Sequence, residues 1–524
     1  MKMRNFWGCL GILALTAGMT ACSSDDDNDN GGSTGGNTGG STDSTSYVWG
    51  TNGGLKSCDH LLFNADGTEN PNGTEIGNGA QEFVFTGKQT LKKGTYTLKG
   101  WVYIADGAEL TIEPGTVIKG DKQTKAALIA ERGGKLIAQG TASEPIVFTS
   151  EQPKGQRKPG DWGGVILCGK ARNNQKEMQI EGGPRSQHGG DNDSDNSGVL
   201  SYVRIEFAGY PFEENKEING LTLGSVGSQT KIDHVQVSYS NDDSFEWFGG
   251  TVNAKYLVAY HGWDDDFDTD NGFSGKVQFG LSVRDPRIAD TSQSNGFESD
   301  NCADGSVSAS PLTTATFSNI TFVGPKAAAD FANNEQYINA GAFNPQNGSA
   351  LGKFQAAMQI RRSSCLNVIN SVAVDWPIGL IVDGEKGNTP AQAKDGKMKV
   401  QNVWMANMDI IGSDANKLYE DVLVTGYSNK KPVKDSTQVS FSHTFFAAEQ
   451  TGNKYFADRA ELKLTDALGV GSAFVPQAGS PLLSAAAFAG LDTWFDTVNY
   501  IGAFDAANNW LSGWTCFDPE NMDY

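Results

Sequence analysis

Gly107-Ala108-Glu109-Leu110-Thr111-Ile112 recurs 26 residues later as Gly133-Gly134-Lys135-Leu136-Ile137-Ala138. An alternating apolar segment precedes each copy, at residues 102–104 and 128–130. Short β segments that are separated by glycine turns and repeat roughly every 20 to 30 residues are typical of a parallel β-helix. In that fold each coil buries one edge of its residues and stacks on the next coil about 4.8 Å away.

Later segments carry the same pattern of an aliphatic residue, then Asn or Asp, then alternating apolar residues. They are Ile232-Asp233-His234-Val235-Gln236-Val237, Ile369-Asn370-Ser371-Val372-Ala373-Val374 and, more loosely, Phe317-Ser318-Asn319-Ile320-Thr321-Phe322. Helix-forming stretches are scarce and glycine is abundant, at 64 residues, which favours an all-β chain with many tight turns. A β-sandwich would need hairpin turns such as Asn-Gly throughout, and a propeller would need a blade-sized motif. Parallel stacking therefore fits better.

Two groups of segments resemble right-handed, pectin-lyase-like β-helix lipoproteins of Bacteroidota. The group at the start comprises Leu110–Ile118, Pro145–Ser150 and Gly160–Gly164, and the group at the end comprises Trp494–Phe504 and Gly513–Thr515. The resemblance covers most of residues 80–524 and implies a right-handed parallel β-helix with capped ends. Most such proteins are uncharacterised, so the resemblance identifies the fold better than the function.

The N-terminus reads as a secretory signal peptide. Lys2 and Arg4 precede an apolar run, Leu10–Ala17, that is too short to span a bilayer. The run ends in Gly18-Met19-Thr20-Ala21-Cys22, which resembles a lipobox in which Met stands where Leu is usual. We therefore expect cleavage before Cys22 and lipidation of Cys22. The alternative is an ordinary signal peptide in which Cys22 is incidental.

The next segment is polar and reads as a tether. Ser23–Asn30 is SSDDDNDN, and residues 31–46 are almost entirely Gly, Ser, Thr and Asn, a composition that stays flexible because it has no apolar surface to bury. The acidic run resembles the signal that exports Bacteroidota lipoproteins to the cell surface, and a solvated linker is the alternative. We expect a protein anchored by lipid in the outer membrane and exposed at the cell surface.

The expected organisation has five parts. They are a signal peptide at 1–21, a disordered linker at 22–46, an N-terminal lead-in and cap at 47–95, the β-helix at 96–475 and a C-terminal cap at 476–524. The aromatic-rich end of the chain suits a cap, because a solenoid must cover its exposed terminal coil. Trp494, Trp510 and Trp514 are expected to pack there, with sugar stacking as the alternative.

The charge balance narrows the possible partners. The chain carries 41 basic and 62 acidic residues, for a net charge of −21 at pH 7, which disfavours nucleic acid and anionic membrane surfaces. Cations, neutral polysaccharides or an outer-membrane transporter fit better as partners. No run of eighteen apolar residues follows Cys22, so the chain itself is not expected to conduct solute.

Five cysteines follow Cys22, and their wide spacing suits neither a disulfide scaffold nor a zinc site. Pairing of Cys302 with Cys365, or of Cys58 with Cys516, remains open. Cys168 lies in an apolar run and is expected to be a buried thiol.

The most informative chemistry is a repeated acidic strand. Asp242–Glu246 aligns with Asp264–Asp268 at an offset of 22, and Phe267–Asn271 aligns with Phe297–Asn301 at an offset of 30. If the phenylalanines stack inside the coil, the alternating neighbours point to solvent, one rung apart. The acids expected on this outward ladder are Asp242, Glu246, Asp264, Asp266, Asp268, Asp270, Glu298 and Asp300.

Stacked carboxylates repel one another by roughly 1 kcal/mol per pair in water and several times more at lower dielectric. Lys276 and Arg284 lie near but are too few to balance the ladder. Calcium is the natural counter-ion, because it accepts six to eight oxygen ligands in flexible geometry, and no organic cofactor is indicated. The alternative is a solvated face whose acids cap turns.

Two functions follow from these features. The first is a non-enzymatic surface binding module that holds calcium and captures a glycan or serves a transporter. The second is a calcium-dependent polysaccharide lyase or glycoside hydrolase, for which the candidate residues are Asp243, Asp264, Asp265, His261 and Arg361. Arg361-Arg362 could also bind a substrate carboxylate, although salt bridges to nearby acids are the commoner role. The absence of a clear catalytic pattern favours binding.

Overall fold

A computed structural model describes residues 47–48, 62, 70–80, 82–181, 185–213, 216–339, 349, 351–448, 451–507 and 509–524. The expected signal peptide, the lipidated Cys22 and the linker at 22–46 lie outside these residues. Within the described part of the chain, no helix is both long and apolar enough to cross a membrane.

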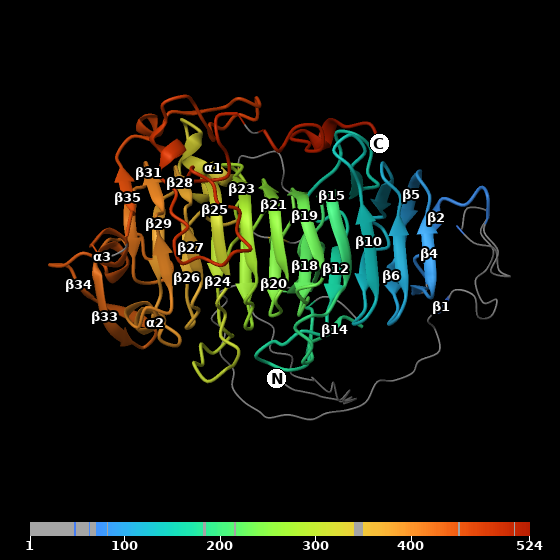
Figure 1. Cartoon of the computed structure of the whole chain (residues 1–524), viewed down its shortest axis with the longest axis horizontal. Helices are drawn as coiled ribbons and strands as arrows, with labels where there is room; N and C mark the ends of the chain where they lie inside the picture. Colours follow the sequence, from blue (N-terminus) through green and yellow to red (C-terminus); the bar gives the residue numbers. More distant parts are fainter. Residues whose placement is uncertain are drawn as a thin grey trace, which may run out of the picture.

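Nearly all described strands join two long sheets that lie along the solenoid (Figure 1). The first sheet contains β1 (Tyr47–Val48), β3 (Phe83–Phe85), β6 (Trp101–Ile104), β9 (Ala127–Ala130), β12 (Gly164–Cys168), β18 (Leu221–Gly224), β20 (Phe245–Phe248), β22 (Phe267–Asp270), β24 (Phe297–Ser299), β26 (Ala356–Ile360), β29 (Ile378–Val382) and β32 (Ile410–Ser413).

The second sheet contains β2 (Glu75–Ile76), β4 (Lys88–Leu91), β5 (Thr95–Leu98), β7 (Glu109–Ile112), β8 (Val117–Gly120), β10 (Lys135–Gln139), β11 (Ile146–Ser150), β15 (Gly198–Glu206), β19 (Lys231–Ser238), β21 (Asn253–Tyr260), β23 (Lys276–Val283), β25 (Thr316–Val323), β27 (Asn367–Ile369), β28 (Val372–Val374), β30 (Lys399–Gln401), β31 (Trp404–Ala406) and β35 (Lys454–Phe456). All pairings within both sheets are parallel.

The register of the sheets confirms the parallel β-helix. Strand β10 pairs with β7 so that Leu136 lies opposite Leu110, and β9 pairs with β6 so that Leu128 lies opposite Val102. Both pairs keep the 26-residue offset of the sequence repeat. The predicted all-β solenoid is therefore correct, and the repeats that reveal it are equivalent positions on neighbouring coils.

Each coil contributes one strand to the first sheet and one bent strand, or two short ones, to the second. The bend in the second sheet occurs at residues in the left-handed conformation, among them Tyr202, His234 and Tyr256 with φ of 51°, 52° and 60°. This conformation is uncommon for residues with a Cβ atom, and here it recurs at the same place in successive coils. The bend closes the coil around its apolar interior.

Aromatic residues fill the middle of that interior. Phe245, Phe267 and Phe297 are fully buried on three successive strands, and the ring of Phe267 lies 5.6 Å from each of the other two rings. Trp247 and Phe317 pack against the same stack. The predicted stacking of these phenylalanines inside the coil is confirmed. Because successive residues of a strand point to opposite faces, the acidic residues next to the phenylalanines lie on the outward face.

Smaller elements decorate the solenoid. The hairpins are β13 (Met178–Gln179) with β14 (Gln187–His188), β16 (Pro211–Glu213) with β17 (Lys216–Glu217), β33 (Leu423–Ser428) with β34 (Lys431–Asp435), and β36 (Leu464–Thr465) with β37 (Val475–Pro476). The helices are α1 (Glu335–Asn339), α2 (Thr389–Lys394) and α3 (Phe441–Ala448), with short 3₁₀ turns η1 (Pro325–Ala327), η2 (Arg459–Leu462), η3 (Pro481–Ser484) and η4 (Pro519–Asn521).

The C-terminal end of the core is closed by α3 and not by the end of the chain. Phe445 and Phe446 of α3 are buried in the same apolar cluster as the interior of the coils. The described residues of the expected terminal cap, 476–507 and 509–524, instead run back along the side of the second sheet (Figure 1). Asn402 near the C-terminal coils donates to Ala485 O at 2.7 Å, and Lys119 near the N-terminal coils donates to Tyr524 O at 2.7 Å.

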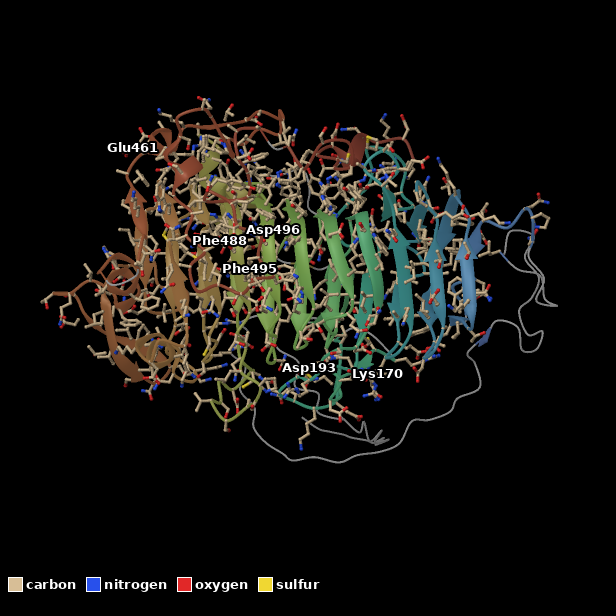
Figure 2. The ribbon with its side chains drawn as sticks, in the orientation of Figure 1. Lys170, Asp193, Glu461, Phe488, Phe495 and Asp496 are labelled. Atoms are coloured by element: carbon tan, nitrogen blue, oxygen red, sulfur yellow. The ribbon has the colours of Figure 1, made fainter. Side chains whose placement is uncertain are left out.

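The reason for this path is a row of polar side chains on the second sheet that bond the backbone of the tail. Gln278 donates to Asp496 O and accepts from Asp496 N, both at 2.8 Å. Figure 2 shows Phe488, Phe495 and Asp496 over the strands at the centre of the solenoid. Trp510 and Trp514 are 8 % and 0 % exposed, so packing, and not an open sugar platform, is confirmed for these two rings, whereas Trp494 is partly exposed beside Lys255.

Two further expectations change. The β-helix begins before residue 96, because β3 already pairs with β6 and β4 with β7. Cys302 and Cys365 are free and buried, as are Cys168 and Cys516. The Cys302 to Cys365 pairing that the sequence leaves open is therefore not formed. Cys516 is also unpaired, and Cys58 lies outside the described residues.

Candidate metal centre

The repeated acidic strand forms a continuous row on the outward face of the first sheet. Strand pairing places Glu246 opposite Asp268, and Asp268 opposite Glu298. The row continues on the coils to either side with Thr222 and Gln359. The alignments at offsets of 22 and 30 therefore predict the register correctly.

The acids of this row are buried, although the sequence predicts that they face solvent. Glu246 is 1 % exposed, Asp268 3 % and Glu298 7 %. The chain connecting the coils covers this face of the sheet, so that Ile180 and Ile218 pack with Phe248, two residues beyond Glu246. The solvated-face alternative is accordingly wrong for these three carboxylates.

One end of the row is neutralised by arginine. Arg361 forms an ion pair with Glu298, and its Nε lies 3.0 Å from Asp300 Oδ1. Arg362 Nη1 lies 2.7 Å from Asp300 Oδ2. Salt bridging is thus confirmed for Arg361-Arg362, which directly follow the end of β26.

Asp266 belongs to a separate ion pair. Arg284 Nη1 lies 2.9 Å from Asp266 Oδ1, and both side chains are fully buried. Ser282 Oγ donates to the other oxygen at 2.5 Å. Burial raises the pKa of Asp266, and the Arg284 charge opposes that rise. Both of its oxygens have partners, so the structure does not bring Asp266 into the cation cluster described next.

The centre of the row holds two overlapping groups of carboxylates. Asp243, Glu246 and Asp268 each offer an oxygen, and these oxygens lie within 4.8 Å of one another. A second group that meets the same limit consists of Asp242, Asp243 and Asp264. Asp243 is shared by both groups, although its place in the sequence suggests only a catalytic role. We call Asp243, Glu246 and Asp268 the acidic triad.

Neutral hydrogen-bond donors pair with some of the carboxylate oxygens of the triad and leave others without a donor. The Asn219 side-chain amide donates to Glu246 Oε2, and the Asp265 backbone N–H donates to Asp243 Oδ1 at 2.8 Å. Within the described part of the chain, Glu246 Oε1 and Asp268 Oδ1 are buried without a hydrogen-bond partner. Buried carboxylate oxygens in this state are costly unless a proton or a cation compensates them.

The three carboxyl groups of the triad lie close together and are buried away from water. Burial raises the pKa of Asp243, Glu246 and Asp268 well above the ordinary carboxyl range, and the neighbouring carboxylates raise it further. Arg361 opposes the rise at Asp268. A hard divalent cation that accepts several oxygens would relieve both the burial cost and the repulsion.

His261, Asp264 and Asp265, which the sequence offers for the catalytic alternative, each have partners of their own. His261 packs on Tyr260, its Nδ1 lies 3.1 Å from the Tyr239 hydroxyl, and burial lowers its pKa to about 4. Asp264 accepts from Ser292 Oγ at 2.8 Å, and Asp265 accepts from the Asn295 N–H at 2.5 Å. Burial raises the pKa of both carboxyls well above their usual range.

The remaining predicted ligands lie at the edge of the cluster. Asp270 is 1 % exposed, and its carboxylate accepts from the Asn271 N–H, while Asp242 is partly exposed. Sequence reasoning missed Asn219 and Gln359. Continuing the alignment by one coil finds Gln359 opposite Glu298, whereas the sequence gives no signal for Asn219, because it comes from the turn before β18.

A family model and a solved structure are similar to this chain. The model of the pectate-lyase-like β-helix domain matches residues 84–455. The chain belongs to this family. A crystal structure of the Dettilon tailspike protein is also similar, with 11 % identity, a TM-score of 0.24 and coverage of 64 % of this chain and 61 % of that chain. No curated protein sequence matches this member of the pectate-lyase-like β-helix family.

Proposed function

We propose that this chain is a non-enzymatic binding module whose acidic triad holds a divalent cation, with calcium as the natural occupant. The observation that carries the proposal is the pair of buried oxygens, Glu246 Oε1 and Asp268 Oδ1, which lie without partners beside Asp243. Calcium binds carboxylate, carbonyl and water oxygens in flexible geometry. Binding only to the folded state would stabilise the protein, by about 2.7 kcal/mol at a free calcium concentration of 100 Kd.

The enzymatic alternative receives less support. Inverting glycoside hydrolysis uses carboxyl groups about 6.5 to 9.5 Å apart to admit a water molecule, whereas oxygens of Asp243 and Asp264 lie within 4.8 Å. A lyase needs a base beside the cation, and Arg361 is engaged with Glu298 and Asp300. Burial of the triad also argues for a structural cation that orders the coils around a binding surface.

The location is part of the proposal. A lipid on Cys22 would hold the β-helix at the outer membrane, and the polar linker would let it reach a transporter or a surface polysaccharide. Mass spectrometry of the N-terminal peptide from membrane-extracted protein tests this directly. A diacylglyceryl-modified Cys22 is expected, and an unmodified peptide that begins at another residue would contradict it.

The cation is tested with the full-length protein in mild detergent. Terbium luminescence and calorimetry with calcium are compared for the wild type, Glu246→Gln and Asp268→Asn. Binding should weaken at least tenfold in both variants. Glu461→Gln is the matched control, because Glu461 is exposed and lies outside the triad (Figure 2). Equal affinity in all four proteins would exclude the triad as the site.

Turnover is measured on the same preparations with acidic and neutral polysaccharides, each with and without calcium. The binding-module proposal predicts no new unsaturated or reducing ends in any combination. Calcium-dependent product formation that Asp268→Asn abolishes would overturn it in favour of the enzymatic alternative.

A further inference from the structure

A cavity of about 300 Å³ opens between three connecting segments of the solenoid. Its walls come from the segment between β12 and β13, the turn after β14 and the segment between β24 and β25. The residues of its lining that bear on a ligand are Arg172, Lys176, Glu177, Gly190, Asp191 and Ser310. Figure 2 shows Asp193, the ion-pair partner of Arg172, at the lower edge of the solenoid. We call this space the edge cavity, and no residue of the acidic triad lines it.

The walls of the edge cavity are held by side-chain amides. Asn173 is 5 % exposed, and its side-chain amide donates to Lys176 O at 2.9 Å. The Asn174 side chain donates to Asn301 O at 2.6 Å, which ties the first wall to the segment that carries Ser310. The shape of the cavity therefore does not depend on the charged side chains that line it.

Two of the four charged side chains of the lining are neutralised by partners. Arg172 Nε lies 2.9 Å from Asp193 Oδ2. Arg132 Nη1 lies 3.2 Å from Glu177 Oε1. These pairs leave one cation and one anion of the lining, Lys176 and Asp191, to be accounted for.

Lys176 and Asp191 are exposed, and their charges have no partner within the described part of the chain. They line the same cavity but do not form an ion pair with each other, so the ammonium and the carboxylate lie more than 4.0 Å apart. A molecule that carries one anionic and one cationic group can neutralise both charges at once. A simple anion or cation would satisfy one and repel the other.

The uncharged part of the lining offers further hydrogen bonds. Among the residues that the structure describes, the Gly190 N–H and the Ser310 hydroxyl have no hydrogen-bond partner. Pro311 adds an apolar surface beside them. A donor, a hydroxyl and an apolar wall between two opposite charges match a peptide group between two charged termini.

We propose that the edge cavity binds a short zwitterionic peptide. The terminal carboxylate of the peptide accepts from the Lys176 ammonium, and its terminal ammonium donates to Asp191. The peptide group between them bonds to the Gly190 N–H and the Ser310 hydroxyl. A volume of about 300 Å³ is at the lower end of the range for small-molecule sites and suits a dipeptide. The site needs no divalent cation, so it is independent of the acidic triad.

The experiment is a ligand-observed NMR titration of the full-length protein in chelator at constant ionic strength. At about pH 6.5 both termini of a dipeptide are charged. The probes are glycylglycine, N-acetylglycylglycine, which lacks the ammonium group, and glycylglycinamide, which lacks the carboxylate. The variants are Lys176→Asn and Asp191→Asn. Asn suits position 176 because Lys176 has φ of 75° and Asn tolerates this conformation.

The matched control variants are Lys125→Asn and Glu461→Gln. Lys125 also has a positive φ, of 53°, and both control residues are exposed and lie outside the edge cavity. The wild type and both controls should bind glycylglycine, and each cavity variant should bind it roughly fivefold or more weakly. Each capped probe should bind the wild type more weakly by a similar factor.

A charge on the protein should matter only when its partner is present on the ligand. Asp191→Asn should therefore not weaken N-acetylglycylglycine further, and Lys176→Asn should not weaken glycylglycinamide further. No binding of glycylglycine by the wild type, or equal binding of all three probes, would overturn the proposal. Equal losses in the control variants would reduce the effect to general charge attraction and overturn the site. Loss of glycylglycine binding in Asp268→Asn would overturn its independence from the triad.

Discussion

Glu246 and Asp268 lie directly opposite each other on adjacent parallel strands, and each has one buried oxygen that lacks a hydrogen-bond donor within the described part of the chain. Two carboxylates about 4 Å apart repel by about 1 kcal/mol in water and about 4 kcal/mol at an effective dielectric of 20. The folded chain therefore carries a local cost that a bound cation would convert into a stabilising contact.

Replacing Asp268 with Asn should change the free energy of unfolding in opposite directions with and without calcium. In chelator the variant should be more stable than the wild type, by on the order of 2 kcal/mol, because one repelling charge is removed. In saturating calcium it should be less stable, because the cation has lost a ligand. Chemical denaturation under both conditions measures the two differences. Glu461→Gln should show neither shift, and an unchanged order of stabilities would contradict a cation at the triad.

Removing Arg361 should destabilise the protein whether or not calcium is present. Arg361→Leu leaves Glu298 and Asp300 buried with one fewer counter-charge, and breaking a buried ion pair in this way costs about 3–5 kcal/mol. Arg172→Leu is the control, because Arg172 pairs with Asp193 at an exposed position. Denaturation midpoints should fall clearly for the first variant and remain unresolved from wild type for the second.

The sequence predicts the register of the acidic row but not its surroundings. Parallel coils repeat equivalent positions, so the offsets that align Phe245, Phe267 and Phe297 also align Glu246, Asp268 and Glu298. Burial of the row depends on connecting segments whose own repeats are irregular. The sequence therefore supports a solvent-facing ladder equally well, and only the folded chain excludes it.

The route of the chain end was also beyond sequence reasoning. An aromatic-rich terminus suits a cap on any solenoid, and nothing local distinguishes the end of the coil from its side. The deciding residues are Gln236 and Gln278, which lie on strands far from the tail in sequence and bond its backbone. They lie in different rows of the second sheet, on opposite sides of the left-handed bend, so their shared contact with the tail becomes visible only in the folded chain.

His188 should make the protein less stable in mild acid. Its ring is fully buried beside Ser225, and burial lowers its pKa to about 3 from an ordinary value of 6.5. Below pH 6.5 the unfolded chain binds a proton that the folded chain does not, so stability falls with falling pH by about 1.4 kcal/mol per unit. Between pH 7.5 and 5.0 the wild type should lose about 2 kcal/mol more than His188→Gln.

Denaturation curves of the two proteins at both pH values measure this difference. Calcium is held at a fixed saturating concentration, so that the acidic triad contributes equally to each. Parallel loss of stability in the wild type and in His188→Gln would show that other groups carry the acid sensitivity.

Two glutamines should each hold only the nearby stretch of the C-terminal tail, residues 476–524, on the second sheet. Gln278→Met removes both bonds to the Asp496 backbone, and Gln236→Met removes the two to the Cys516 backbone. A lost buried bond costs about 1–3 kcal/mol, so amide hydrogen exchange should accelerate roughly tenfold or more near the affected residue. Each variant serves as the control for the other, because each should loosen its own stretch of the tail. Equal acceleration along the whole of residues 476–524 in both variants would instead mean that the tail docks and releases as one unit.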